Sequence, residues 1–337
     1  MSDHLILLAP SGNRVYAGVA DRLMAAELTI LLGPDGPVVE PVELAGVPYL
    51  RLDLEALDER TTRALALLSG RYAVFGRQDG LLRPVPVPPV DLLADDLVSI
   101  PKYPGKTNEQ FTRLLLNVTL ASVARPPGEL TVLDPLCGRG TTLSAALTFG
   151  HSAAGVEADA KAVELYAAFL RDYLRRKRLK HSLTVSPVRR DGKSLGRRLD
   201  LTVTPADSAE PLTLTLFTGD TRQSAALDGR RRFDAIVADA PYGVVHGSHT
   251  DVRGMGGGRD RSPAALLTEA LPVWAGQLKA GGALGLSWNR HGLSRERLVE
   301  VTSAAGLEPR DDGPYRALDH RVDASIHRDV LVAVRPR

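Results

Sequence analysis

The stretch ELTVLDPLCGRGTTL, residues 129–143, decides the expected fold. It reads as a short apolar strand, a turn with two glycines and the start of an Ala-rich helix. From about residue 100 onward, strand-like and helix-like segments alternate, and further strands are expected in HSAAGVE, LTLTLFTGD, FDAIVAD and GGALGLSWN. This alternation predicts an α/β fold with a doubly wound sheet. The glycine turn then lies at the carboxyl end of the first strand, where such sheets bind ligands.

The length of the chain predicts more than one domain. At 337 residues, of which 44% are hydrophobic and 24% charged, the chain exceeds the size at which a single core usually stops growing. The Pro-rich run RPVPVPPV is typical of a stiff linker. We therefore expect a small N-terminal α/β domain at 1–85, a linker at 86–104 and a larger domain at 105–337. In the small domain, HLILLA and ELTILL are expected as strands and 57–69 as a helix.

Cysteine usage and hydropathy indicate the compartment. A single cysteine excludes a disulfide framework and a Cys-rich zinc site, and it suits a reducing cytoplasm. The N-terminal MSDHLILLAP has no cationic leader and no long apolar run, so no signal peptide is expected. No stretch approaches the ~20 apolar residues of a membrane span. We expect a cytoplasmic protein that makes no membrane contact.

Positive charge is concentrated in the second part of the chain. Residues 1–95 hold 8 Lys/Arg and 13 Asp/Glu, although the whole chain has a net charge of +2. Residues 171–198 hold 11 Lys/Arg and two Asp, and this segment runs from a helix into a basic insertion expected at about 175–212, which includes a β-hairpin around PADSAEP. This density of cations predicts contacts with nucleic-acid phosphates, and a solvated helix face is the alternative. The candidate phosphate-binding residues are Arg175, Arg176, Lys177, Arg178, Arg189 and Arg190.

Acidic residues follow four of the expected strands, and these are Asp134, Glu157, Asp220 and Asp239. The carboxyl ends of parallel strands meet at one edge of a sheet, so these side chains are expected to converge. Clustered carboxylates repel one another unless a cationic or hydrogen-bonding ligand offsets the repulsion. S-adenosylmethionine matches this need, because it offers an ammonium, a sulfonium and a ribose diol and carries no phosphate. The alternative is that each acid caps the helix after its strand.

Two motifs carry a family resemblance. LDPLCGRGTTL resembles the first motif of the class I methyltransferases, and DAPYG at 239–243 resembles the fourth motif of those that methylate exocyclic amines of nucleobases. Within that class, the chain is most similar to the RNA methylases that include the tRNA guanine-N2-methyltransferases usually fused to a THUMP domain. The resemblance covers roughly residues 100–337. It implies a Rossmann-like sheet, doubly wound, whose last strand is antiparallel.

The resemblance also implies a set of residues around S-adenosylmethionine. Glu157 is expected to hold the ribose and Asp220 the adenine. The cofactor loop is expected to contain Asp134, Cys137, Gly138, Gly140 and Thr141, and the residues near the methionine end are Lys106, Thr107 and Asn108. Thr107 and Gln110 also have the spacing of a capping box at the start of a helix.

The DAPYG stretch predicts the chemistry. An exocyclic base amine is a poor nucleophile until its nitrogen becomes tetrahedral. Asp239 can accept one amine hydrogen, and a backbone carbonyl held by Pro241 can accept another, which favours that geometry. Tyr242 can stack on a base lifted out of its helix. The alternative is a strand-end turn in which Asp239 caps a helix and Tyr242 fills the core.

Several residues near the DAPYG stretch have other expected roles. The Gly-rich segment 243–262 is expected to close over the site. Within it, His246 and His249 are interpreted as solvated side chains, with relay of the released proton as the alternative, and no metal site is expected. Trp274 and Trp288 are expected in the core.

The expected function is S-adenosylmethionine-dependent N-methylation of RNA, with guanine N2 in tRNA as the target. Ala240 stands where base-amine methylases of DNA usually have a proline, which favours RNA. The open alternatives are a DNA methylase acting on adenine N6 or cytosine N4, a small-molecule methylase, and a non-catalytic nucleic-acid-binding protein with the same fold.

Overall fold

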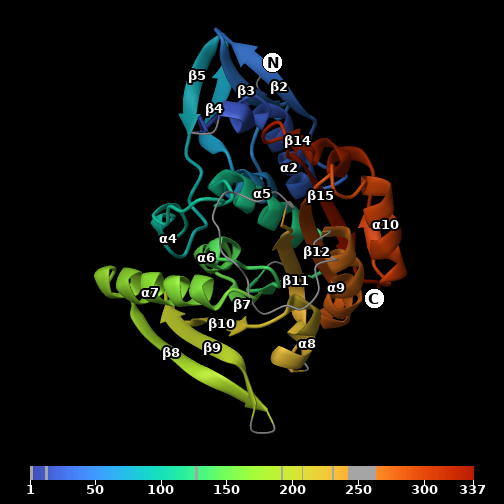
Figure 1. Ribbon diagram of the computed structural model, residues 1–337. Coiled ribbons are helices and arrows are strands. Elements are labelled where there is room, and N and C mark those ends of the chain that lie inside the picture. The colour runs from blue at the N-terminus through green and yellow to red at the C-terminus, as the bar shows by residue number, and fades with distance from the viewer. Residues whose placement is uncertain are drawn as a thin grey trace.

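The computed structural model describes residues 3–11, 14–125, 128–190, 193–206, 208–229, 231–241 and 263–337. Its strands form two sheets (Figure 1). A five-stranded sheet has the order β2-β3-β1-β4-β5, and a ten-stranded sheet has the order β13-β15-β12-β11-β6-β7-β10-β9-β8, with β14 paired to β15. In Figure 1 the small sheet lies at the top of the view and the large sheet below it.

The small sheet and its helices come from the first 85 residues. The elements are β1 (Asp3–Leu8), α1 (Arg14–Ala17), α2 (Ala20–Leu32), β2 (Val39–Leu44), β3 (Val47–Leu52), α3 (Glu59–Leu67), β4 (Arg71–Gln78) and β5 (Leu81–Val85). The HLILLA strand and the helix within 57–69 are confirmed. The ELTILL strand is wrong, because this run forms the last turns of α2. A short apolar run fits a strand or a buried helix equally well, and here Leu23 and Leu28 are fully buried on the helix.

The remaining elements alternate between helix and strand. They are α4 (Asp96–Ser99), α5 (Glu109–Leu120), β6 (Thr131–Asp134), α6 (Thr141–Thr148), β7 (Ser152–Glu157), α7 (Ala160–Arg176), β8 (Lys180–Arg190), β9 (Lys193–Thr204), β10 (Leu212–Thr218), the 3-10 helix η1 (Thr221–Gln223), α8 (Ser224–Leu227), β11 (Phe233–Asp239), α9 (Pro263–Gln277), β12 (Leu278–Asn289), α10 (Arg295–Ala304), β13 (Glu308–Arg310), the 3-10 helix η2 (Gly313–Leu318), β14 (His320–Arg321) and β15 (His327–Val334).

Strand pairing confirms the doubly wound, Rossmann-like sheet. Strands β10, β7, β6, β11 and β12 are parallel neighbours, and β15 runs antiparallel between β12 and β13. The expected hairpin around PADSAEP is confirmed as β9 and β10, and β8 extends it by a further antiparallel strand. The carboxyl ends of β6, β7 and β11 therefore lie along one edge, which we call the carboxyl edge.

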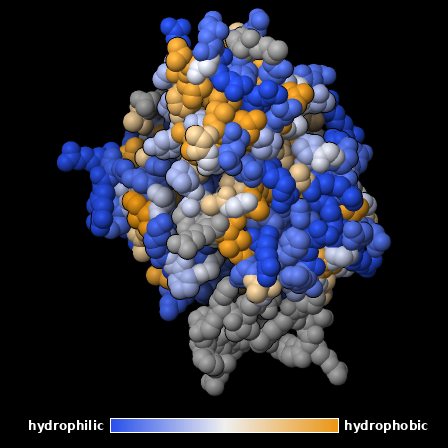
Figure 2. Space-filling view, turned by 90° about the horizontal axis from the view of Figure 1, so that it is seen from above, coloured by the Kyte–Doolittle hydropathy of each residue, from blue (hydrophilic) through white to orange (hydrophobic). Residues whose placement is uncertain are grey.

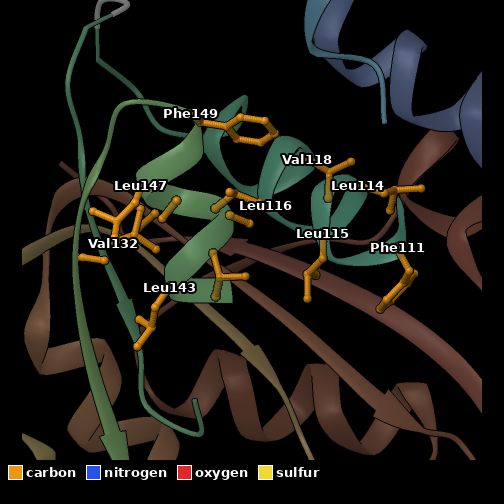
Figure 3. Close-up of a cluster of buried hydrophobic side chains, with 14 of the residues drawn as sticks. Phe111, Leu114, Leu115, Leu116, Val118, Val132, Leu143, Leu147 and Phe149 are labelled. Carbon is orange, nitrogen blue, oxygen red and sulfur yellow. The ribbon is translucent and has the colours of Figure 1, made fainter. Parts of the chain in front are cut away.

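Two hydrophobic clusters cover the two faces of the large sheet. Along β11, Ala235 and Val237 belong to the cluster with α5, α6 and α7, whereas Ile236 and Ala238 belong to the cluster with α9 and α10. This alternation is what period-2 side-chain placement in a strand requires. Figure 3 shows the buried side chains of α5 and α6 gathered beside the strands. In the second cluster, both tryptophans are fully buried, as expected from the sequence.

The start of α5 differs from the expected capping box. Asn108 is the N-cap, and its side chain accepts a hydrogen bond from the backbone N–H of Phe111 at 3.1 Å. The prediction for Thr107 and Gln110 is wrong, because the helix begins one residue later than the spacing suggested. Thr107 is left outside the helix, and its hydroxyl is directed to Asp239 at the end of β11.

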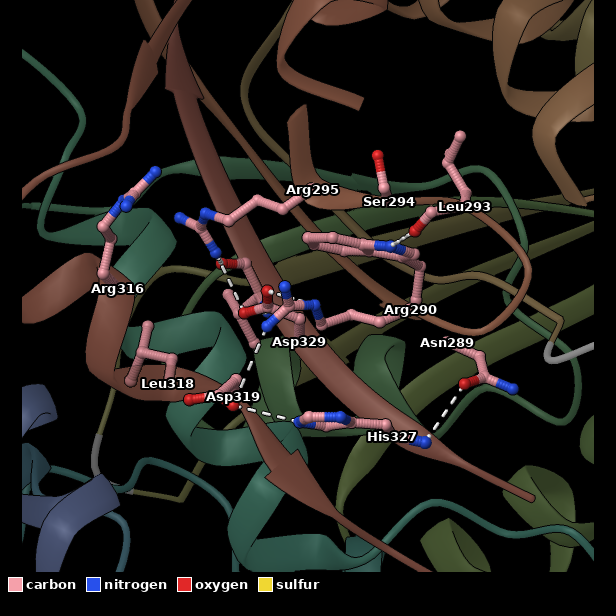
Figure 4. A network of polar contacts seen from close by, with 12 residues as sticks. Asn289, Arg290, Leu293, Ser294, Arg295, Arg316, Leu318, Asp319, His327 and Asp329 are labelled. Atoms are coloured by element: carbon pink, nitrogen blue, oxygen red, sulfur yellow. Dashed lines mark hydrogen bonds and ion pairs between the residues drawn. The ribbon is translucent and has the colours of Figure 1, made fainter. Parts of the chain in front are cut away.

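A polar network anchors the last strand. Arg295 of α10 donates to Asp329 of β15 at 2.9 Å and to Asp311 at 2.6 Å. Nearby, His327 contacts Asp319 at 3.0 Å, and Figure 4 shows these groups lying side by side along β15. Because Asp329 is 1% exposed, the pairing offsets the cost of burying its carboxylate.

The surface on the side of the small sheet is mixed in polarity. Seen from above, hydrophobic side chains form a band flanked by hydrophilic ones (Figure 2). The exposed apolar residues of this sheet include Val47, Leu81 and Leu82. Among the described residues, no helix combines the length and the apolar character that crossing a bilayer would require.

Candidate active site

A cavity of about 640 Å³ opens at the carboxyl edge of the large sheet. Its walls come from the segment before α5, the turn between β6 and α6, the end of β11, and the turn that leads into β15. The structure thus brings together residues that are far apart in sequence. The predicted site residues that line it are Lys106, Thr107, Asp134, Cys137, Gly138, Thr141, Asp239 and Pro241.

The two glycines of the turn have different reasons to be glycine. Gly138 has a φ of +52° and lines the cavity, and a Cβ there would meet no atom within 4 Å. A ligand can therefore approach its backbone. Gly140 has a φ of +75°, and a Cβ there would lie 2.4 Å from the ring of Tyr166 in α7. Gly140 does not line the cavity, so it allows α6 and α7 to pack closely rather than a ligand to approach.

Asp134 is the buried acid of the cavity. It is 2% exposed, and its carboxylate accepts from the backbone N–H of Leu136 at 3.0 Å. Burial, and to a smaller extent the negative charges of Asp239 and Glu157, raise the pKa of Asp134 to about 7. The predicted convergence of strand-end acids therefore appears here as an electrostatic coupling between three of them.

The other two predicted acids lie outside the cavity wall. Glu157 accepts from the backbone N–H groups of Gly138 and Asp159, both at 2.8 Å, and burial raises its pKa. It braces the glycine turn and keeps acceptor positions of its carboxylate beyond these two bonds. Asp220 caps η1 and is paired with Arg222 at 2.7 Å, and hydrogen bonding from Arg222 lowers its pKa. Of the four strand-end acids, Asp220 is thus the one that caps the helix after its strand, as the alternative interpretation expected.

Asp239 ends β11 inside the cavity. The Thr107 hydroxyl donates to its Oδ2 at 2.6 Å, and Nη2 of Arg328 lies 4.0 Å from the same oxygen. The next peptide is fixed as well, because the N–H of Ala240 donates to the carbonyl of Ser287 on β12 at 2.8 Å. Tyr242, the segment 243–262 and its two histidines lie outside the described residues.

Of the three residues expected near the methionine end of the cofactor, two line the cavity and one does not. Lys106 lines the cavity, but its ammonium donates to Glu109 and to the carbonyl of Val98, each at 2.6 Å. Thr107 holds Asp239. Asn108 does not line the cavity, since its side chain caps α5 and donates to Ser11 at 3.3 Å.

Sequence reasoning missed several residues of the cavity wall, among them Tyr103, Arg139 and Arg328. The hydroxyl of Tyr103 lies 2.7 Å from that of Thr141, and the Arg139 guanidinium lies 4.7 Å from the Tyr103 ring centroid. Tyr103 belongs to a segment without regular secondary structure, which gives no periodic signal. Arg328 enters from β15, where a cation inside the apolar run HRDVLVAV was a signal that could have been used.

The basic candidates lie in two groups at opposite ends of β8. Helix α7 begins at the carboxyl edge and runs back toward the opposite edge of the sheet, where the parallel strands start. This opposite edge therefore carries Arg175 and Arg176, in the last turn of α7, and Lys177 and Arg178, which follow it. Two of these are paired, Arg176 with Asp172 at 2.9 Å and Lys177 with Asp96 at 2.5 Å. The structure does not bring this group to the cavity.

Arg189 and Arg190 end β8 on the opposite side. The register pairs Phe217 of β10 with Arg198, and Arg190 with Lys193. This end of the hairpin therefore extends past the carboxyl end of β10 by roughly 15 Å of strand. Of the predicted phosphate-binding residues, these two lie toward the edge that holds Asp239.

Comparison with known proteins gives fold similarity at low identity. No family model matches the sequence, and no curated protein matches it. TrmN from Thermus thermophilus is 14% identical over 99% of this chain and 100% of that chain, with a TM-score of 0.46. A TehB-like SAM-dependent methyltransferase from Corynebacterium glutamicum is 17% identical over 63% and 82%, with a TM-score of 0.36. The N-methyltransferase NodS from Bradyrhizobium japonicum is 12% identical over 68% and 96%, with a TM-score of 0.40.

At these identities the similarity extends at most to the chain fold. The chemistry of the site is therefore inferred from the residues of this chain.

Proposed function

We propose that the protein is an S-adenosylmethionine-dependent N-methyltransferase that acts on an exocyclic amine of a nucleobase, with guanine N2 in tRNA as the target. One observation carries the proposal. The Asp239 carboxylate and the Gly138 turn open into the same cavity. A methyl acceptor and a methyl donor must meet at such a place, because the transfer requires the two reacting atoms to be held in line.

The cavity residues fit S-adenosylmethionine, which supplies a methyl group bound to a positively charged sulfur. Gly138 leaves its backbone accessible to a flat ligand, and the buried Asp134 offers a hydrogen-bond acceptor beside it. Burial, together with the negative charges of Asp239 and Glu157, raises the pKa of Asp134 to about 7, and the sulfonium and ammonium charges would favour its ionised form. Glu157 braces the turn from behind and would hold the ribose.

Asp239 and the peptide after it would orient the amine. The carboxylate accepts one amine hydrogen, and the carbonyl of Ala240 accepts the other. The hydrogen bond from Thr107 holds the Asp239 carboxylate, and the bond from the Ala240 N–H to the Ser287 carbonyl fixes the peptide that precedes the Ala240 carbonyl. Two fixed acceptors favour a tetrahedral nitrogen and stabilise the positive charge that develops on it during transfer. Pro241 fixes the turn that follows.

A nucleic-acid partner accounts for the basic insertion. The end of β8 that carries Arg189 and Arg190 extends past the carboxyl edge, where it could contact phosphates beside a base in the cavity. The resemblance of the DAPYG stretch, with Ala240 in place of a proline, favours RNA over DNA. A tRNA substrate and the single cysteine suit a cytoplasmic protein.

The test is to identify the modified nucleoside. The protein is incubated with methyl-labelled S-adenosylmethionine and separate pools of tRNA, ribosomal RNA and DNA, and each pool is hydrolysed and analysed by mass. The proposal expects N2-methylguanosine in tRNA. Label in N6-methyladenine or N4-methylcytosine of DNA would support the DNA alternative. Cofactor binding without transfer to any pool would support a non-catalytic binding protein.

A further inference from the structure

Arg328 is a buried cation in the cavity that the sequence-based site did not include. It is the second residue of β15, lines the cavity and is 5% exposed. Its guanidinium carbon lies 4.2 Å from the centroid of the Phe111 ring, and its Nη2 lies 4.0 Å from Oδ2 of Asp239. A buried arginine is costly to desolvate, so its place beside an acid of the cavity requires a reason.

The charges around the cavity supply that reason. The acidic side chains on its wall are Asp134, Asp239 and Asp323. Burial is the main cause of the raised pKa of Asp134, and the negative charge of Asp239 raises it as well, because neighbouring carboxylates disfavour one another's charged form. Glu157 adds to this effect from behind the glycine turn.

The cations of the wall are held differently. Lys106 is bound by Glu109, and the Arg139 guanidinium lies over the ring of Tyr103. Arg328 lies 4.0 Å from Asp239, and it approaches the oxygen that already accepts from Thr107. The positive charge of Arg328 and the hydrogen bond from Thr107 therefore act on the same oxygen, Oδ2 of Asp239.

Arg328 is held from two sides. Phe111, near the start of α5, provides a flat surface for the guanidinium, an arrangement that arginine favours. On the other side, β15 pairs with β12 in a register that sets Arg328 opposite Asn289. The next residue, Asp329, is fixed by Arg295 in the network of Figure 4. The Phe111 ring thus holds the guanidinium, and the strand register holds the backbone that carries it, before any ligand enters.

We propose that Arg328 is a positioning residue, which balances the charge of Asp239 and, with Thr107, fixes its carboxylate toward the acceptor amine. It acts through Asp239 and makes no contact with the methyl donor. The proposal rests on the proposed function for the role of Asp239, and it assigns a part of the site to the C-terminal strand.

The test compares three variants. Arg328→Met removes the charge and keeps an apolar stem against Phe111. Arg328→Lys keeps the charge and loses the planar group. Arg290→Met is the matched control, because Arg290 makes ion pairs of similar length, 3.8 Å to Asp329 and 4.0 Å to Asp319, and does not line the cavity.

For Arg328→Met we expect kcat to fall about 100-fold, the loss typical of a displaced reacting group. The affinity for S-adenosylhomocysteine should stay within about twofold of that of the unmodified protein, because the residue does not hold the donor. The kcat of Arg328→Lys should lie between that of Arg328→Met and that of the unmodified protein. Arg290→Met should keep full activity. Guanidinium chloride, added below denaturing concentrations, should restore part of the activity of Arg328→Met, whereas equal urea or sodium chloride should not.

Unchanged kcat, an equal loss of cofactor affinity, or no rescue by guanidinium would each overturn the proposal. If the unmodified protein transfers no methyl group, the proposed function is refuted, but the role of Arg328 is still open to test. A crystal structure of Arg328→Met then provides that test. The proposal expects the Asp239 carboxylate to turn away from Thr107 in this variant. A Thr107–Asp239 hydrogen bond that persists at its present length would refute it.

Discussion

Glu27 provides a quantitative prediction about how the small sheet joins the rest of the chain. This residue of α2 is fully buried, and its carboxyl accepts from Asn117 of α5 at 2.7 Å. It also accepts from Ser69, from the backbone N–H at 3.1 Å and from the hydroxyl at 2.6 Å. Burial raises the pKa of Glu27 to about 7, against the opposing effect of these donors. Glutamine in its place would mimic the protonated form, because its amide can donate to the Ser69 hydroxyl and accept from the others.

The size of the effect follows from the pKa. Because the folded-state value lies above the ordinary value of 4.5, the folded state binds more protons between the two, and the free energy of unfolding falls as the pH rises through this window. A change from 4.5 to about 7 corresponds to about 3 kcal/mol at ~1.4 kcal/mol for each tenfold change in proton affinity. Glu27→Gln should remove this loss.

The assay is urea unfolding of both proteins across this pH range. At about pH 5 their free energies of unfolding should agree within about 1 kcal/mol, and at about pH 8.5 the variant should be more stable by about 3 kcal/mol. Asp134 also titrates near pH 7, but it is present in both proteins and cancels in the difference. A variant that is less stable at every pH, or a difference that does not change with pH, would refute the reasoning.

Two further predictions concern the glycine turn and the basic hairpin. Gly140→Ala should lose about 2–5 kcal/mol of unfolding free energy, from the left-handed φ and the clash with Tyr166, and combining it with Tyr166→Leu should reveal a coupling above about 1 kcal/mol. Additive losses in the double variant would contradict the clash. Arg190→Glu should weaken tRNA binding and flatten its salt dependence more than Arg175→Glu, because only the former lies toward the carboxyl edge. Equal effects, measured by filter binding over a salt series, would argue against this placement.

The parallel strands β6, β7, β10 and β11 of the large sheet could be predicted because each is short, mostly apolar and bounded by a turn. FDAIVAD reads as a buried strand, and in the structure its residues alternate between the two hydrophobic clusters. ELTILL has the same local character, yet it forms a helix. For such a short apolar run, the packing of the surrounding chain decides between strand and helix, and the run itself does not.

The cavity was predictable where its residues follow strands along the chain. Asp134, Gly138 and Asp239 lie at strand ends, and topology alone brings these ends together. Thr107 and Arg328 reach Asp239 from outside that pattern, the first because α5 starts one residue late and the second because β15 folds back beside β12. Such contacts depend on register between distant segments, which a single sequence does not reveal.

The most direct test of the account is methyl transfer by Asp239→Asn beside the unmodified protein, with tRNA as the acceptor and the nucleoside identified. The variant keeps the shape of the side chain and removes the charge that is proposed to stabilise the amine. The account predicts N2-methylguanosine with the unmodified protein, a loss of kcat of at least about 100-fold in the variant, and unchanged binding of S-adenosylhomocysteine. Full turnover by Asp239→Asn would contradict it.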